Sequence, residues 1–373
     1  MNVYAIDAFD KTSASSVLWR PSSSSVVIVR LPEMDLIWDR ALYYLKIFEP
    51  YIPYAIAPLG VYSLSRLLPY FVPGPQHQKP LNVKDRTVLI TGASTGLGRE
   101  LAFRFYAKGA KVILTARSID KLKELCEELK QFGQQNGIEN VHEPVFHYLD
   151  IAEINGGIEE ITKKAIDGKT IDVLVNNAGL TMRGSCQETP LEIQRQLMEV
   201  NFFGHVAVTK ALLDSIPDDG AILVTSSVQG RVAIPYRSAY SASKHALQAF
   251  FDCLRTEDRA NLQILVVSAG YMNTGFGKRA LKADGTPMGV EDENQKRGLS
   301  AEDASKQIFD ALVARKTELV LAPFSSKAAI FLRWFAPNLL FWMLHKRGQK
   351  QHDAEMKKAA EAALGEASQA TSS

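Results

Sequence analysis

Short apolar runs of strand length recur through the middle of this chain and alternate with segments of helical pattern. The runs are VLIT (88–91), VILTA (112–116), VLVN (173–176), ILVTSS (222–227), ILVVS (264–268) and LVLA (319–322). Runs this apolar suit strands that are covered on both faces, and their alternation with helices predicts βαβ units around a parallel sheet. With 373 residues, 46% of them apolar, the chain can bury a large core. We therefore expect an α/β fold: a Rossmann-type, doubly wound parallel sheet in a single catalytic domain with extensions at both ends.

Charge and cysteine content exclude several classes of function. Lys and Arg number 43 against 41 Asp and Glu, so the net charge is +2 and no basic field for nucleic acid exists. Cys126, Cys186 and Cys253 lack the spacing of metal ligands or redox pairs. We therefore expect no metal site, no disulfide scaffold and a reducing compartment.

The N-terminal quarter differs from the α/β region. Residues 1–35 are predicted to form an irregular, serine-rich lead without a secretory signal. Residues 36–73 include 16 uncharged residues from Pro50 to Ser65, with aromatic residues within and around them. This pattern favours a short membrane anchor or an interfacial segment, and the alternative is a hairpin packed on the protein itself. Residues 74–83 form a proline-containing linker.

The remaining boundaries follow from composition. Residues 84–323 are the expected catalytic domain. Residues 324–347 form a second apolar stretch, interrupted by Arg333 and Pro337, which fits either a lid over the pocket or a membrane contact. Residues 348–373 are rich in Ala, Glu, Lys and Ser and are expected to be a flexible tail.

A glycine-rich turn follows the first strand and precedes a helical segment. Gly92 suits a tight turn off the strand, Gly96 lets the backbone approach a pyrophosphate, and Gly98 lets the helix pack closely on the sheet. The N-terminus of that helix offers free N–H groups to phosphates. The other predicted contacts in this turn are Ser94, Thr95 and Leu97. The context predicts a dinucleotide site.

The end of the second strand indicates which dinucleotide. An acid there would accept from the 2′-hydroxyl of NAD, but the sequence has Ala116 followed by Arg117. A guanidinium can pair with a 2′-phosphate, which favours NADP(H). Asp150, at the end of a strand-like segment, is a candidate acceptor from the adenine amino group. Asn177, Ala178 and Gly179 form a small turn that lets backbone approach a ribose.

Tyr240 and Lys244 lie four residues apart in a helical pattern, so their side chains share one face. A nearby ammonium lowers the pKa of a phenol, which would otherwise be a poor base. Ser227, thirteen residues before the tyrosine, can orient a carbonyl oxygen, and Ser226 is the competing serine. Asn201, inside an apolar helical pattern, fits either a buried kink or a group that holds a water for proton relay to Lys244.

These pieces together resemble the short-chain dehydrogenase/reductase family over roughly residues 84–323. The matching motifs are TGASTGLG, NNAG, VNFFG, SS before QG, YSASK and AGYMNT. The resemblance implies that Tyr240 is the general acid, Lys244 its pKa-lowering partner and a cofactor-ribose ligand, Ser227 the carbonyl-polarising residue and Asn201 the relay asparagine. It also implies a contact from Thr274 to the nicotinamide carboxamide.

The sequence departs from the family at one point and approaches one branch of it closely. Where the family has Pro-Gly after the sixth strand, this chain has Ala269 and Gly270, which frees the backbone before the loop over the nicotinamide. The segment RSAYSASKHALQAFFDCLRTE (237–257) resembles the dehydrogenase/reductase 7B-like branch. That branch implies an N-terminal anchor in the endoplasmic reticulum or peroxisomal membrane, with the catalytic domain facing the cytosol; without an anchor the protein would be cytoplasmic.

We therefore expect an NADP(H)-dependent carbonyl reductase or alcohol dehydrogenase. A lipophilic ketone or alcohol, such as a steroid, a retinoid or an acyl-ketone lipid, suits the apolar residues in the loops beyond the strand ends. Those residues are Met182, Val232, Ile234, Pro235, Tyr236, Tyr271, Met272 and Phe276. The alternative is a membrane-anchored, NADPH-binding scaffold with little turnover. A homodimer is a family-level expectation.

Overall fold

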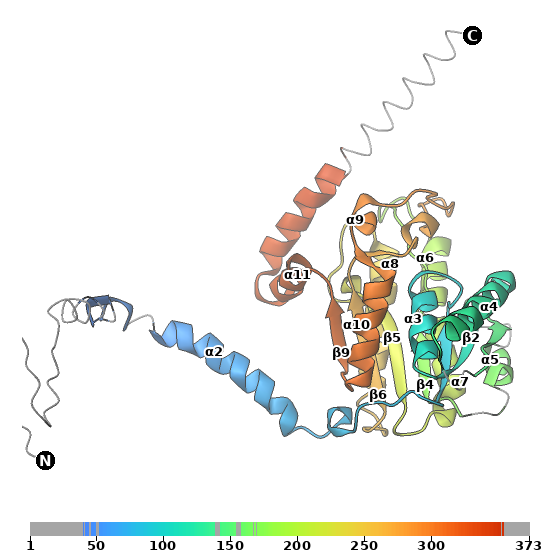
Figure 1. Ribbon diagram of the computed structural model, residues 1–373. Coiled ribbons are helices and arrows are strands. Elements are labelled where there is room, and N and C mark those ends of the chain that lie inside the picture. Colours follow the sequence, from blue (N-terminus) through green and yellow to red (C-terminus); the bar gives the residue numbers. More distant parts are fainter. Residues whose placement is uncertain are drawn as a thin grey trace, which may run out of the picture. The chain divides into compact units, whose positions relative to one another are not determined.

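The computed structural model describes residues 40–353, apart from 41, 45, 50–51, 139–141, 154–157, 167, 169 and 352. The expected lead at 1–35 and the part of the expected tail from residue 354 lie outside these residues. Within them, seven parallel strands form one sheet in the order β3-β2-β1-β4-β5-β6-β9 (Figure 1). The strands are β1 (Thr87–Thr91), β2 (Lys111–Ala116), β3 (Val145–Tyr148), β4 (Val173–Asn176), β5 (Ala221–Ser227), β6 (Gln263–Ala269) and β9 (Glu318–Leu321). The predicted doubly wound parallel sheet is confirmed.

Helices cover both faces of the sheet (Figure 1). One face packs against α3 (Gly96–Ala107), α4 (Ile119–Gln135) and α10 (Ala301–Val313). The other face packs against α5 (Ile158–Ile166), α7 (Gly204–Leu212) and α8 (Ser238–Leu254). Successive residues of a strand point to opposite faces, so Val88 and Ile90 join the first cluster and Leu89 the second. Because both clusters are apolar, the strands contain the continuous apolar runs that the sequence displays.

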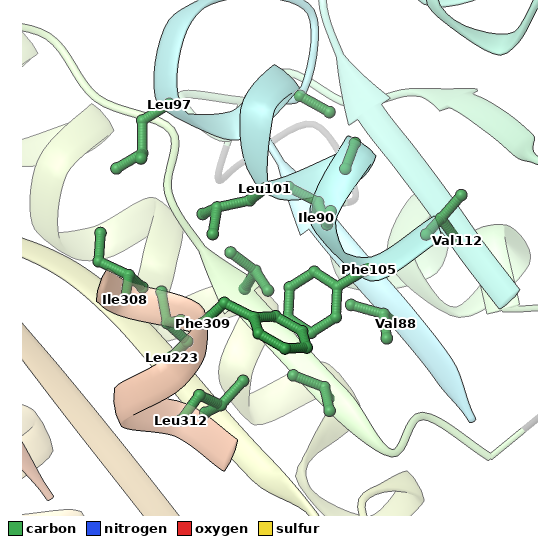
Figure 2. Packing of buried hydrophobic residues seen from close by; sticks show 14 of the residues in the cluster. Val88, Ile90, Leu97, Leu101, Phe105, Val112, Leu223, Ile308, Phe309 and Leu312 are labelled. Atoms are coloured by element: carbon green, nitrogen blue, oxygen red, sulfur yellow. The ribbon is translucent and has the colours of Figure 1, made fainter. Parts of the chain in front are cut away.

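The first of these clusters joins helices that are distant in the sequence (Figure 2). Phe105 of α3 meets Phe309 of α10 edge to face, with ring centroids 5.3 Å apart. Leu101 and Leu312 are fully buried beside them. This packing fixes α3 against the sheet, and α3 begins at the glycine-rich turn.

The chain forms two compact units that divide between Leu68 and Pro69. In the first unit, α2 (Ile52–Leu67) covers most of the uncharged stretch noted above. A short helical turn, Leu68–Tyr70, spans the division between the units. Among the described residues no helix combines the length and the apolar character that crossing a membrane requires.

Two segments of the second unit lie beyond the carboxyl ends of the strands. The first is the connecting segment, residues 274–298, which lies between the paired strands β7 (Met272–Asn273) and β8 (Leu299–Ser300) and includes α9 (Glu293–Lys296). The second comprises α11 (Phe324–Phe335) and a helix over residues 337–351, which together we name the C-terminal helices.

Candidate active site

The glycine-rich turn has the geometry that its sequence predicts. Gly92 has φ +64° and Gly96 has φ +59°, the left-handed region that glycine tolerates best. A Cβ on Gly98 would lie 2.4 Å from the carbonyl oxygen of Gly92 and 2.5 Å from Nδ2 of Asn177. The first turn of α3 therefore packs directly on the ends of β1 and β4, and its N–H groups face the crevice where the strand order reverses.

One hydroxyl that the sequence reasoning missed joins those two strand ends. Thr91 is fully buried, and its Oγ1 donates to the carbonyl of Val175 at 3.1 Å. The same oxygen accepts from the backbone N–H groups of Asn177 at 2.9 Å and Ala178 at 3.2 Å. The turn over Asn177–Gly179 is thereby held against β1. A threonine at the end of a strand is common, so nothing in the sequence distinguishes Thr91 for this role.

A cavity of about 720 Å³ opens along the carboxyl ends of the strands. That volume suits a dinucleotide portion and a small substrate. The predicted residues that line it are Gly92, Ser94, Thr95, Gly96, Leu97, Arg117, Asp150, Asn177, Ala178, Gly179, Ser227, Tyr240, Lys244, Gly270 and Thr274. Gly98 and Asn201, also predicted, lie behind the wall rather than in it.

Basic residues gather at the β2 end of the cavity. Arg117 is mostly exposed, and its guanidinium lies 3.9 Å from a carboxylate oxygen of Asp150. Arg279, from the connecting segment, donates to Oγ1 of Thr95 at 2.5 Å. Burial and the nearby positive charge of Arg117 lower the pKa of Arg279. Sequence reasoning missed Arg279, because it follows the glycine turn by more than 180 positions.

Helix α8 places Tyr240 and Lys244 one turn apart, and both side chains are buried. Nζ of Lys244 donates to the carbonyl of Thr225, on β5, at 2.9 Å. Burial lowers the pKa of Lys244 to about 7, because the surroundings disfavour its charged form. The ammonium is therefore held at the sheet end, on the same wall as the phenol.

Opposing effects act on the phenol of Tyr240. Burial raises its pKa, while a hydrogen bond with Ser227 and the positive charge of Arg237 lower it. Ser227 begins a short helical turn, and its Oγ accepts from the N–H of Gln229 at 3.1 Å. The competing serine, Ser226, accepts instead from Nε2 of Gln248 at 3.1 Å. The geometry therefore sets Ser227, and not Ser226, against the phenol.

Asn201 lies in a π-helical turn, Glu199–Phe203, between α6 (Leu191–Met198) and α7. Its amide pairs with the backbone of Leu180, accepting from N–H and donating to C=O at 2.8 Å each. It also donates to Oγ of Ser243 at 3.0 Å. Both amide hydrogens are used and one lone pair of Oδ1 remains. The buried kink is thus present, and Oδ1 retains the capacity to accept from a water.

A buried ion-pair cluster ties the connecting segment to the catalytic helix. Arg237, at the N-cap of α8, is only 6% exposed and donates to the carbonyl of Met182 at 3.2 Å. A carboxylate oxygen of Asp292 lies 3.6 Å from Arg237 and 3.2 Å from Arg183. Two guanidinium groups share this carboxylate, so positive charge remains beside Tyr240. This cluster was also missed, since nothing in the sequence relates position 292 to position 237.

The apolar part of the cavity wall differs from the expected one. Of the eight loop residues named from sequence, Ile234, Tyr271, Met272 and Phe276 line the cavity. The other four, Met182, Val232, Pro235 and Tyr236, do not. Met182 and Val232 are buried in the protein interior instead, because they face the core. Leu281 and Pro287 of the connecting segment also line the cavity.

Comparison with known proteins decides the family. The family model described as short chain dehydrogenase matches residues 86–284, more than half of the chain. The chain belongs to the short-chain dehydrogenase/reductase family. It is 39% identical over 308 residues to dehydrogenase/reductase SDR family member 7B of Mus musculus, a match that covers 82% of this chain and 92% of the mouse protein. It is 37% identical to dehydrogenase/reductase SDR family protein 7-like of Anopheles gambiae, covering 83% of this chain and 96% of that protein.

Solved structures agree with this assignment. An alcohol dehydrogenase from the archaeon Thermococcus sibiricus, complexed with 5-hydroxy-NADP, superposes with a TM-score of 0.55 at 28% identity. The match covers 64% of this chain and 96% of the archaeal one. A short chain dehydrogenase from Shigella flexneri, complexed with NADP, superposes with a TM-score of 0.55 at 25% identity. This match covers 65% of the present chain and 98% of the Shigella one. The chain is therefore an oxidoreductase of this family.

Proposed function

We propose that this protein is an NADP(H)-dependent carbonyl reductase or alcohol dehydrogenase that acts on a lipophilic ketone or alcohol. The observation that supports this most directly is the convergence of Tyr240, Lys244 and Ser227 on the same cavity as the glycine-rich turn. A steroid, a retinoid or an acyl-ketone lipid would suit the apolar part of the wall.

The residues present fit a dinucleotide. The left-handed glycines and the free N–H groups at the start of α3 form a cradle that a Cβ would fill. Beside them, Arg117 and Arg279 would hold the phosphates, and the absence of an acid at Ala116 leaves room for a 2′-phosphate. NADPH, when bound, supplies a hydride from nicotinamide C4.

The chain's own groups would position the carbonyl and move the proton. The hydroxyl of Ser227 donates to the substrate oxygen and orients it toward Tyr240. Tyr240 then donates its phenolic proton to that oxygen as charge develops on it. Lys244, whose Nζ is fixed by Thr225, favours the resulting phenolate. One lone pair of Asn201 Oδ1 remains available to hold a relay water.

The deciding experiment follows NADPH oxidation by the detergent-solubilised full chain with a panel of lipophilic ketones, beside Tyr240→Phe. Losing the general acid should lower kcat by about 10²–10⁴-fold. Equal turnover in both proteins would remove Tyr240 from the mechanism. NADPH binding without turnover on any ketone would favour the scaffold instead.

The cofactor preference has a separate test. Arg117→Ala should raise the KM for NADPH far more than the KM for NADH, because only NADPH has the 2′-phosphate. A matched control is Lys123→Ala, an exposed cation that lies outside the cavity lining on α4, the helix that follows Arg117. Equal effects on both cofactors would refute the assignment to NADP(H).

We also propose that residues 36–73 attach the protein to the endoplasmic reticulum or peroxisomal membrane, with the catalytic domain in the cytosol. The aromatic and uncharged composition of this segment supports the proposal. Carbonate extraction and protease protection of the full chain, compared with a chain that begins at residue 74, test it. A full chain that fractionates like the truncated one would contradict it.

A further inference from the structure

The C-terminal helices expose an unusual amount of apolar surface. Trp334 is 82% exposed and Trp342 is 59% exposed. Six more large apolar side chains are exposed around them: Phe324, Phe331, Phe335, Leu339, Phe341 and Met343. The rings of Phe331 and Phe335 stack with their centroids 4.1 Å apart. Exposed large apolar side chains gathered on one short segment indicate an interaction site. Tryptophan and phenylalanine are also the residues that settle at the boundary between lipid headgroups and acyl chains.

The charge on this surface has one sign. Between residues 324 and 351 the chain has five Lys and Arg residues and no Asp or Glu, although the two classes are nearly equal over the whole sequence. The five are Lys327, Arg333, Lys346, Arg347 and Lys350. All five are exposed. The guanidinium of Arg333 lies 5.1 Å from the ring centroid of Phe341, which joins the two helices.

The same helices border the active-site cavity. Ser326 of α11 and Arg347 of the second helix are among its lining residues. Arg347 donates to the hydroxyl of Tyr271 at 2.9 Å, and a Cβ on Gly348 would lie 3.2 Å from the Cβ of Pro235. One side of the C-terminal helices is therefore fixed on the domain beside the cavity, and the other side is apolar and basic.

We propose that the exposed face of the C-terminal helices docks on the surface of a lipid bilayer that contains anionic lipids. Aromatic side chains enter the headgroup boundary, while Lys327, Arg333, Lys346 and Lys350 pair with lipid phosphates and carboxylates. Arg347 stays on the domain side, bonded to Tyr271. A lipophilic substrate would then reach the cavity from the bilayer without crossing bulk water. Charge argues against the other occupants: a second copy would set cations against cations, and α2 has no acidic residue to pair with them.

Two of the chain's four tryptophans, Trp334 and Trp342, lie on this face, so tryptophan fluorescence can report its contact with a membrane. Trp19 and Trp38 lie outside the C-terminal helices, so the variant Trp19→Phe/Trp38→Phe reports only from Trp334 and Trp342. We expect the emission of this full-length variant to shift to shorter wavelength when vesicles of phosphatidylcholine with about 30% phosphatidylserine are added, because anionic lipid makes their surface negative. Brominated acyl chains should quench it. Vesicles bound with no shift and no quenching would show that another segment attaches the protein, and would overturn the proposal.

Charge variants test the electrostatic part. Lys346→Gln/Lys350→Gln should weaken binding to the anionic vesicles by roughly 25-fold, at about five-fold for each lysine near the surface. The matched control is Lys108→Gln/Lys306→Gln, which removes the same charge from an exposed position just after α3 and another on α10 and should leave binding unchanged. Equal loss in both variants, or a spectral shift that depends on protein concentration without vesicles, would refute a membrane-facing role. These readouts measure binding and not turnover, so they are independent of the proposed reaction.

Discussion

Replacing the active-site lysine with an apolar residue should make the protein more stable while it abolishes turnover. Lys244 is 3% exposed, and burial lowers its pKa from 10.5 to about 7. At 1.36 kcal/mol per pH unit this difference corresponds to about 5 kcal/mol, which the folded state loses by burying an ammonium. Lys244→Met removes this cost of burying a charge and nearly keeps the volume of the side chain.

The stability gained in Lys244→Met should depend on pH. The folded state binds the proton of Lys244 less tightly than the unfolded state, so the penalty is complete below pH 7 and disappears as the pH approaches 10.5. At pH 7 it is about 4 kcal/mol. Losing the bond from Nζ to Thr225 subtracts about 1 kcal/mol. The net gain of about 3 kcal/mol should raise Tm by about 10 °C at pH 7, and almost nothing should remain at pH 9.5.

Thermal unfolding of the apoproteins at about pH 6.5, 8 and 9.5 measures the stability difference between Lys244→Met and the parent, because these values enter the range from about 7 to 10.5 in which the lysine titrates. The control is Lys108→Met, an exposed lysine after α3. A Lys244→Met protein that is less stable than the parent at pH 6.5 would refute the reasoning. So would a stability difference that stays constant across the three pH values.

Three further outcomes follow from the structure. Gly98→Ala should cost about 1–3 kcal/mol of unfolding free energy and weaken NADPH binding, since its Cβ would overlap the strand end; unchanged Tm and Kd would contradict this. Arg315→Met should cost roughly 3 kcal/mol in urea unfolding, because the buried guanidinium donates to four oxygens of neighbouring segments, and a loss below about 1 kcal/mol would argue otherwise. Asp292→Asn should move the alkaline limb of kcat/KM to lower pH, because an unpaired Arg237 lowers the pKa of Tyr240 further. Arg237→Met should move it to higher pH, and shifts in the same direction would exclude this electrostatic role.

Local patterns were sufficient for the fold and for the centre of the site. The run VLIT (88–91) became β1 with one residue added, and ILVTSS (222–227) became β5 with one residue added. Gly92, Tyr240 and Lys244 could be placed because their spacing is set by a single turn or a single helix.

Residues that act across long sequence separations could not be predicted. Arg237 and Asp292 meet because the connecting segment folds back over α8, and the intervening 54 residues have no repeating pattern. Arg347 reaches Tyr271 across 76 positions. The π-helical turn at Asn201 could not be predicted from the hydrophobic period either, because it interrupts an otherwise regular helical pattern for only five residues.

The order of the strands also determines when this site can first exist during synthesis. Val88 of β1 pairs with Val112 on one side but with Val173, 85 positions later, on the other. While the ribosome makes the intervening residues, one edge of this apolar central strand has no partner, and such edges promote aggregation. The crevice between β1 and β4 closes only when β4 emerges, and the catalytic helix α8 emerges still later. A nucleotide can therefore assist only the last steps of folding, after the apolar edge of β1 has been covered by β4.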